Sequence, residues 1–239
     1  MLFQPDEWHN VASGRIFILG CGPSLLGQID LLPRLDEEAT MTCNGTGKWD
    51  ALPFKPTYHC TTDIPRHKWL EDVIGSWEGT DRFAFQRQGE EPHEAYYIVP
   101  TDHDGVQVFS YGMAGMGDQW ENMRTARTTP LTIAQLAWWM GYREFYYLGI
   151  EQTRGYAWNP EQSISVTGRA EFPLDKSPKY LYAIQRCAKR MREEIEASGG
   201  HIYDCTPQGF LNETYPYPQT ENSATQLDIL EYKELSEVL

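Results

Sequence analysis

The sequence has little positive charge, few cysteines and no long hydrophobic run. Lys and Arg together number 20, whereas Asp and Glu number 34, which gives a formal net charge of −14. Nucleic-acid affinity depends on Lys and Arg neutralising phosphates, so this balance argues against a broad nucleic-acid-binding face, but not against a small phosphate site. No apolar run approaches the roughly 18 residues that a membrane-spanning helix needs.

The five cysteines are odd in number and spread along the chain, without a CxxC pair or a Cys/His cluster of zinc spacing. We therefore expect free thiols and assign no metal-binding residue. The first 14 residues carry Asp6 and Glu7 but no Lys or Arg, which is atypical of a signal peptide. These features together predict a cytoplasmic protein without a membrane span.

The chain of 239 residues is 41% hydrophobic, 23% charged and 13% aromatic. These shares are typical of a globular protein, and a chain of this length can bury a full core without disulfides or metals. The many aromatic rings can fill a core or line a ligand cleft.

Apolar runs and helical periodicity alternate along the chain, which predicts an α/β fold with a largely parallel sheet. The expected strands are residues 15–19, 40–45, 57–63, 82–85, 96–99, 106–109, 144–148 and 201–203. The expected helices are residues 66–74, 131–140 and 179–197, the second of them closed by Gly141. Residues 213–239 form a C-terminal extension in this interpretation, packed on the body of the protein or on a neighbour.

Residues 152–177 are polar and show no period, and a loop of this length is uncommon unless it is functional. We interpret the segment as a lid loop. Its rings Tyr156 and Trp158 can close over a ligand, or they can pack onto the body of the protein.

The first strand ends in a glycine-rich turn, Gly20-Cys21-Gly22-Pro23-Ser24. Such a turn lets backbone N–H groups approach a phosphate or a nucleotide sugar. It lacks the third glycine of the dinucleotide fingerprint and the Gly-Lys-Ser/Thr of a P-loop. The alternative is a tight turn that needs glycine for its own geometry.

Two more polar segments follow strands, Asn44-Gly45 and Thr61-Thr62-Asp63. Ligands of open α/β sheets bind at the carboxyl ends of the strands, so the three segments together predict a site there. The Asn44 amide can bind a base or a ribose, and Asp63 can bind a ribose hydroxyl or Mg²⁺. Each residue alone can equally be an ordinary turn residue.

Polar residues also precede the helix that Pro130 opens. Its N-terminus can bind an anion together with nearby arginines, or these residues can simply cap the helix. The residues concerned are Arg124, Arg127, Thr128 and Thr129.

In combination, these motifs resemble the sialyltransferases of glycosyltransferase family 42 and the related flagellin-glycosylation and archaeal 6-hydroxymethylpterin diphosphokinase-like proteins. The resemblance covers roughly residues 14–212, which we treat as one transferase domain. It rests on Gly20 to Leu25, Cys43-Asn44, Pro130 to Tyr142, Leu148 to Glu151 and Asp204 to Pro207.

The resemblance implies a Rossmann-like fold, with a mostly parallel sheet and helices on both faces, that binds a nucleotide. The implied nucleotide-binding residues are Gly20, Cys21, Gly22, Ser24, Asn44, Thr61, Asp63 and Thr129. In the sialyltransferases two loop tyrosines hold the donor phosphate; Tyr156 matches one of them, and Trp158 lies near the position of the other. The histidine base of those enzymes is missing, because residues 152–180 contain no histidine. Glu151 and Asp175 are the candidate bases.

We therefore expect a nucleotide-dependent transferase that uses a nucleotide-sugar donor and a small-molecule or glycan acceptor. One alternative is a diphosphokinase-like transferase that uses ATP and Mg²⁺, with Asp63 near the metal; only this alternative requires a cofactor. The other is a noncatalytic nucleotide-binding or assembly protein. An oligomer is compatible with each of the three.

Overall fold

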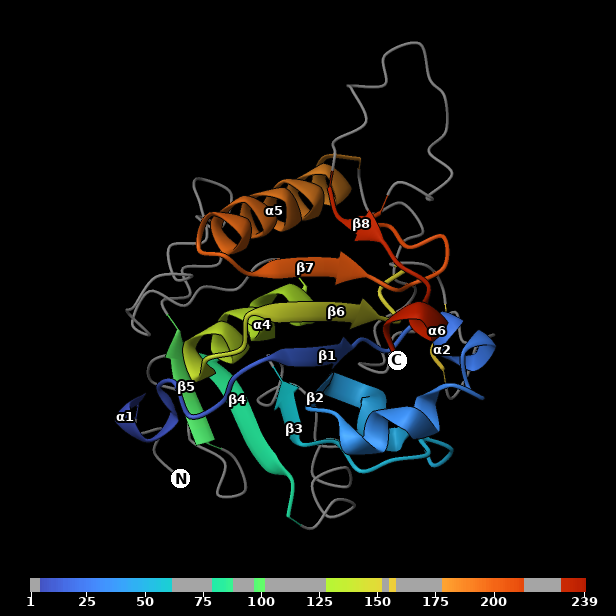
Figure 1. Ribbon diagram of the computed structural model, residues 1–239, viewed down its shortest axis with the longest axis horizontal. Coiled ribbons are helices and arrows are strands. Elements are labelled where there is room, and N and C mark those ends of the chain that lie inside the picture. Colours follow the sequence, from blue (N-terminus) through green and yellow to red (C-terminus); the bar gives the residue numbers. More distant parts are fainter. Residues whose placement is uncertain are drawn as a thin grey trace.

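The computed structural model describes residues 5–61, 79–87, 97–101, 128–151, 155–157, 178–212 and 229–239. Its strands form one sheet of order β5-β4-β3-β2-β1-β6-β7-β8, and every neighbouring pair is parallel (Figure 1). The strands are β1 (Arg15–Leu19), β2 (Thr40–Cys43), β3 (Tyr58–Thr61), β4 (Asp81–Arg87), β5 (Tyr97–Thr101), β6 (Glu144–Leu148), β7 (His201–Asp204) and β8 (Glu231–Tyr232). The predicted α/β fold with a parallel sheet is confirmed.

Helices cover both faces of this sheet. The α-helices are α1 (Pro5–Trp8), α2 (Ser24–Gly27), α4 (Thr129–Met140), α5 (Pro178–Ala197) and α6 (Leu235–Val238), and the 3₁₀ helices are η1 (Leu32–Glu37) and η2 (Asn44–Lys48). One hydrophobic cluster joins the sheet to α4 and α5, and a second joins the opposite face to α2, η1 and α6. This arrangement confirms the Rossmann-like architecture.

The apolar run of β1 serves both clusters, because successive side chains of a strand point to opposite faces. Ile16 and Ile18 belong to the first cluster, and Phe17 and Leu19 to the second. All four side chains are fully buried. A strand that is buried on both faces has a continuous hydrophobic sequence, and for this reason the sequence alone predicts β1.

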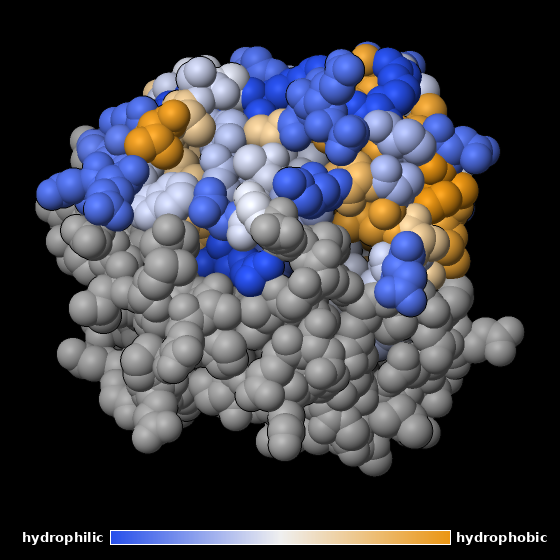
Figure 2. Space-filling model, turned by 90° about the horizontal axis from the view of Figure 1, so that it is seen from below, coloured by the Kyte–Doolittle hydropathy of each residue, from blue (hydrophilic) through white to orange (hydrophobic). Residues whose placement is uncertain are grey.

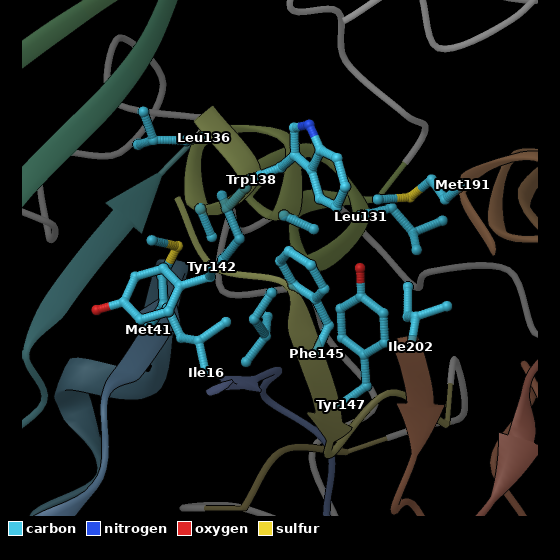
Figure 3. Close-up of a cluster of buried hydrophobic side chains, with 14 of the residues drawn as sticks. Ile16, Met41, Leu131, Leu136, Trp138, Tyr142, Phe145, Tyr147, Met191 and Ile202 are labelled. Carbon is cyan, nitrogen blue, oxygen red and sulfur yellow. The ribbon is translucent and has the colours of Figure 1, made fainter. Parts of the chain in front are cut away.

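Helix α4 is the most deeply buried helix that the structure describes: all of its residues from Thr129 to Met140 are buried. In Figure 3, Leu131 and Trp138 of α4 lie over Phe145 and Tyr147 of β6. The rings of Trp138 and Phe145 stack with centroids 6.2 Å apart. This packing fixes the helix, and with it the position of its first residue at the edge of the sheet.

The predicted elements that fall on described residues are found, several with shifted ends. Helix 66–74, strand 106–109 and most of the loop 152–177 lie outside the described residues. At the other end of the chain, β8 pairs in parallel with β7, and Leu230 forms a bridge with Asn212. Residues 229–239 therefore pack on the body of the protein, while the domain boundary at residue 212 stays a prediction.

Hydrophilic residues cover much of the described surface seen from below, and hydrophobic ones gather on the right of that view (Figure 2). The large hydrophobic side chains most exposed among the described residues are Val11 and Leu26. None of the helices described has both the length and the apolar character needed to cross a membrane.

The carboxyl end of β7 carries a buried acid, Asp204, that organises the following turn. One carboxylate oxygen accepts the Thr206 N–H at 2.9 Å, and the other accepts a side-chain N–H of Asn212 at 3.0 Å. The Thr206 hydroxyl accepts the Ile150 N–H at 3.2 Å, which connects this turn to the end of β6. Burial raises the pKa of Asp204 to about 7 despite these hydrogen bonds.

This raised pKa predicts a pH-dependent stability. Between the unfolded value of 3.8 and the folded value of about 7, the folded protein keeps a proton that the unfolded chain has released. The contribution of Asp204 therefore falls as pH rises through this window, by at most about 1.4 kcal/mol per pH unit. Urea unfolding across the window should show the wild type losing stability relative to Asp204→Asn, whereas the exposed control Asp50→Asn, which keeps Asp204, should follow the wild type. If the stability of Asp204→Asn instead changes with pH in parallel with that of the wild type, the assignment is wrong.

Candidate functional site

The candidate site lies where the direction of strand addition reverses. From β1 the chain adds β2, β3, β4 and β5 on one side, and it then adds β6, β7 and β8 on the other. The carboxyl ends of β1 and β6 are neighbours at this switch point and point toward α2 and α6 (Figure 1). In open parallel sheets this is the position where ligands bind.

The glycine-rich turn after β1 uses its backbone N–H groups within the protein. The N–H groups of Gly20 and Gly22 donate to carbonyl groups at the end of β6, at 2.7 and 2.9 Å. The Ser24 N–H donates to the carboxylate of Glu151, and Pro23 has no N–H. The sequence hypothesis that these N–H groups cradle a phosphate is therefore not supported by their hydrogen bonds.

Glu151 follows β6 and places its carboxylate directly over this turn. The residue is only 7% exposed. Oxygen Oε1 accepts the Ser24 N–H, whereas Oε2 is buried and has no hydrogen-bond partner among the residues that the structure describes. A Cβ atom added at Gly22 would lie 1.5 Å from Oε2, so only glycine leaves room for this carboxylate. Burial raises the pKa of Glu151, and hydrogen bonding by Ser24 offsets part of that effect.

Three predicted site residues from three elements meet in one chain of hydrogen bonds. The Asn44 side-chain N–H donates to the Thr129 hydroxyl at 2.9 Å, and the Thr61 hydroxyl donates to the Asn44 carbonyl oxygen at 3.1 Å. Asn44 has a positive φ of 46°, a left-handed conformation that asparagine tolerates better than most residues. Two of the predicted strand-end residues, Asn44 and Thr61, thus lie together with Thr129 at the start of α4, while their role in binding a ligand stays a prediction.

Cys21 connects the first turn to the end of β2. Its sulfur lies 3.3 Å from the Cys43 carbonyl oxygen and 3.3 Å from the Thr46 hydroxyl. That hydroxyl also contacts the carbonyl oxygens of Gly20 and Cys43, at 3.1 and 2.8 Å. Hydrogen bonding with Cys43 and Thr46 lowers the pKa of the Cys21 thiol although burial opposes it.

Comparison with known proteins gives two solved structures and no sequence relative: no family model and no curated protein matches the chain. The sialyltransferase CstII from Campylobacter jejuni, in complex with cytidine-5'-monophosphate, is 17% identical over 82% of this chain and 81% of that chain, with a TM-score of 0.45. The monofunctional alpha-2,3-sialyltransferase Cst-I from the same organism is 17% identical over 80% and 74%, with a TM-score of 0.47. At these values the likeness carries no conclusion about activity, which has to be argued from this chain's own residues.

The described part of the predicted lid loop lies against the first turn. The Ala157 N–H donates to the Cys21 carbonyl oxygen at 3.0 Å, and the Ala157 side chain is buried. Tyr156 beside it is partly buried. Residues 155–157 therefore touch the candidate site, while the role of the loop as a lid stays a prediction.

Several predicted residues lie outside the described part of the chain, and their roles stay predictions. These residues are Asp63, Arg124, Arg127, Trp158 and Asp175. Across the residues that the structure does describe, no three His, Cys, Asp or Glu side chains group in a way that could hold a metal ion.

Sequence analysis missed one member of the site, Thr46. Its hydroxyl joins the first turn to the β2 end, but it comes after the strand in a 3₁₀ helix, η2 (Asn44–Lys48), that the sequence pattern does not predict. One local clue exists in the sequence. A threonine hydroxyl can donate to the carbonyl oxygen three residues earlier, and Thr46 does so to Cys43.

The contact between Gly22 and Glu151 predicts coupled effects on stability. In Gly22→Ala the new methyl group must displace the carboxylate from the Ser24 N–H, which should cost about 1–3 kcal/mol. Once Glu151→Ala has removed that carboxylate, Gly22→Ala should cost less, so the double variant is less destabilised than the sum of the single variants. Urea unfolding measures all three, with Gly27→Ala as a control, since a Cβ there meets no atom within 4 Å. If the losses of stability of the two single variants simply add in the double variant, the two residues are not in contact.

Proposed function

We propose that this chain is a nucleotide-dependent transferase, a glycosyltransferase-like enzyme that takes a nucleotide-sugar donor and a small-molecule or glycan acceptor. The observation that carries the proposal is the hydrogen-bonded cluster of Asn44, Thr61 and Thr129 at the carboxyl edge of the sheet. It lies at the edge where parallel α/β sheets bind nucleotides.

The cluster keeps hydrogen-bonding capacity for a ligand. An amide side chain has two N–H donors and two lone pairs, and the bonds to Thr129 and Thr61 use one of each on Asn44. The second donor and the second lone pair can bind a base or a ribose hydroxyl. Cys21 at the first turn and Asp63 after β3 complete this nucleotide-binding set in the proposal.

The phosphate group is assigned to the start of α4. Thr129 is the first residue of this twelve-residue helix, and within the described part of the chain the side chain of the preceding residue, Thr128, makes no capping hydrogen bond. The N-terminus of a helix carries a partial positive charge, which favours an anion. The leaving phosphate of a nucleotide sugar would thus lie beside the Asn44 cluster.

Transfer requires a base for the acceptor hydroxyl as the bond between the sugar and the phosphate breaks. Glu151 and Asp175 are the candidates, and Glu151 is the one whose surroundings are known. Its buried carboxylate has a raised pKa and, among the described residues, an oxygen without a hydrogen-bond partner, and both properties favour a proton acceptor. The Tyr156 hydroxyl is proposed to steady the leaving phosphate, and the lid loop with Trp158 to exclude water.

The two alternatives are separated by metal dependence and turnover. A diphosphokinase-like transferase would need Mg²⁺-ATP and a carboxylate at Asp63. A noncatalytic nucleotide-binding or assembly protein would bind a nucleotide but not turn over a donor. Neither alternative is favoured by a specific contact among the described residues.

Ligand-dependent thermal stability distinguishes the three functions. The transferase proposal predicts that one of CMP, UDP or GDP raises the unfolding temperature to the same extent with and without Mg²⁺, because a ligand that binds only the folded state stabilises it. ATP that stabilises only with Mg²⁺ would support the diphosphokinase alternative. Binding without hydrolysis or transfer of any nucleotide sugar would support the noncatalytic one.

The role of Asn44 can be tested apart from its backbone strain. Asn44→Ala and Asn44→Gly both lose the side chain, but glycine accepts the positive φ without cost. We expect both variants to bind the stabilising nucleotide more weakly by about 1–3 kcal/mol, measured by titration calorimetry. Asn44→Gly should be the more stable of the two variants. Unchanged nucleotide affinity in both would show that Asn44 is only a turn residue.

A further inference from the structure

The first turn already contains an anion supplied by the protein. The carboxylate of Glu151 occupies the space over Gly22 and accepts the Ser24 N–H, as a bound phosphate oxygen would. The N–H groups of Gly20 and Gly22 are used by carbonyl oxygens of the β6 end. A second anion at this turn would therefore meet a like charge and find these donors occupied.

We infer that Glu151 determines which part of the nucleotide meets the first turn. The turn binds an uncharged part of the ligand that donates a hydrogen bond, a sugar hydroxyl or a base amino group, and Oε2 of Glu151 is its acceptor. The phosphate is directed away from the turn, toward Thr129. This inference rests on the proposed nucleotide binding and adds how the ligand is oriented. Because it places Glu151 beside the uncharged part of the nucleotide and not beside the reacting phosphate, it leaves Asp175 as the candidate base.

Two buried polar atoms beside Gly22 support this assignment. Oε2 of Glu151 and the hydroxyl oxygen of Ser24 have no hydrogen-bond partner among the described residues. A buried acceptor without a donor is costly, and a ligand hydroxyl or amino group would remove that cost. An acceptor oxygen of the ligand could receive the Ser24 hydroxyl, but it could not satisfy Oε2.

The loop segment 155–157 limits how the ligand reaches this position. Ala157 donates its N–H to the carbonyl oxygen of Cys21, on the same turn. A ligand bound to Oε2 would therefore contact this segment or displace it. The inferred subsite therefore lies between the turn and residues 155–157.

The test compares nucleosides with their 5'-monophosphates by titration calorimetry, using cytidine, uridine, guanosine and adenosine with CMP, UMP, GMP and AMP. The ratio of monophosphate to nucleoside affinity reports the phosphate, and the nucleoside affinity alone reports the uncharged part. The variants are Glu151→Gln, Glu151→Asp and Thr129→Val. Thermal unfolding verifies that each of them is folded.

Glu151→Gln removes the charge and the acceptor with little change of shape. Because the Ser24 N–H requires an oxygen opposite it, the amide nitrogen takes the place of Oε2 and cannot accept a hydrogen bond. We expect nucleoside and monophosphate affinities to fall together by about tenfold or more, with their ratio nearly unchanged. Glu151→Asp, which keeps the charge, should also keep the ratio. Thr129→Val should instead lower the ratio.

The outcomes separate this inference from the proposed function. If Glu151→Gln raises the ratio about tenfold or more, the phosphate lies at the first turn and the inference is wrong. If Glu151→Gln leaves both affinities unchanged, Glu151 is a structural carboxyl, and the inference fails while nucleotide binding stands. If the wild-type protein binds none of the eight compounds, the proposed function itself fails.

Discussion

The contact between the Glu151 carboxylate and the glycine-rich turn is the constraint on which the rest of the site depends. It joins the end of β6 to the end of β1 across the switch point of the sheet, between residues 127 positions apart in the sequence. It requires glycine at position 22, because any side chain there would occupy the carboxylate's place. It also gives the turn a negative charge, which makes the turn unsuitable for a phosphate.

The remaining geometry follows from the parallel sheet. Because all strands run in the same direction, the residues that follow β1, β2, β3 and β6 come to one edge. The buried helix α4 brings Thr129 to the same edge, where Asn44 links it to Thr61. The protein thereby presents a carboxylate at one side of the switch point and uncharged amide and hydroxyl groups at the other. This division of charge suits a ligand with one polar, uncharged end and one anionic end.

Elements with a strong local pattern could be predicted from the sequence. The apolar run of β1 and the period of α5 are examples, since burial on both faces or on one helical face leaves a clear signature. Strand β8 could not be predicted, because two residues, Glu231 and Tyr232, become a strand only by pairing with β7. The positions of the site residues at strand ends were also predictable, whereas their partners were not. Glycine is required at position 22 because of the Glu151 carboxylate, and no local sequence pattern links two residues so far apart.

The central claim is that a nucleotide binds at the carboxyl ends of β1, β2 and β6, and a crystal structure of the protein with its best-binding nucleotide tests it most directly. We expect the sugar or base beside Gly22 and Glu151, Asn44 within hydrogen-bonding distance of the ligand, and the phosphate at the start of α4. A nucleotide bound elsewhere on the protein, or one with its phosphate on the glycine-rich turn, would contradict the account.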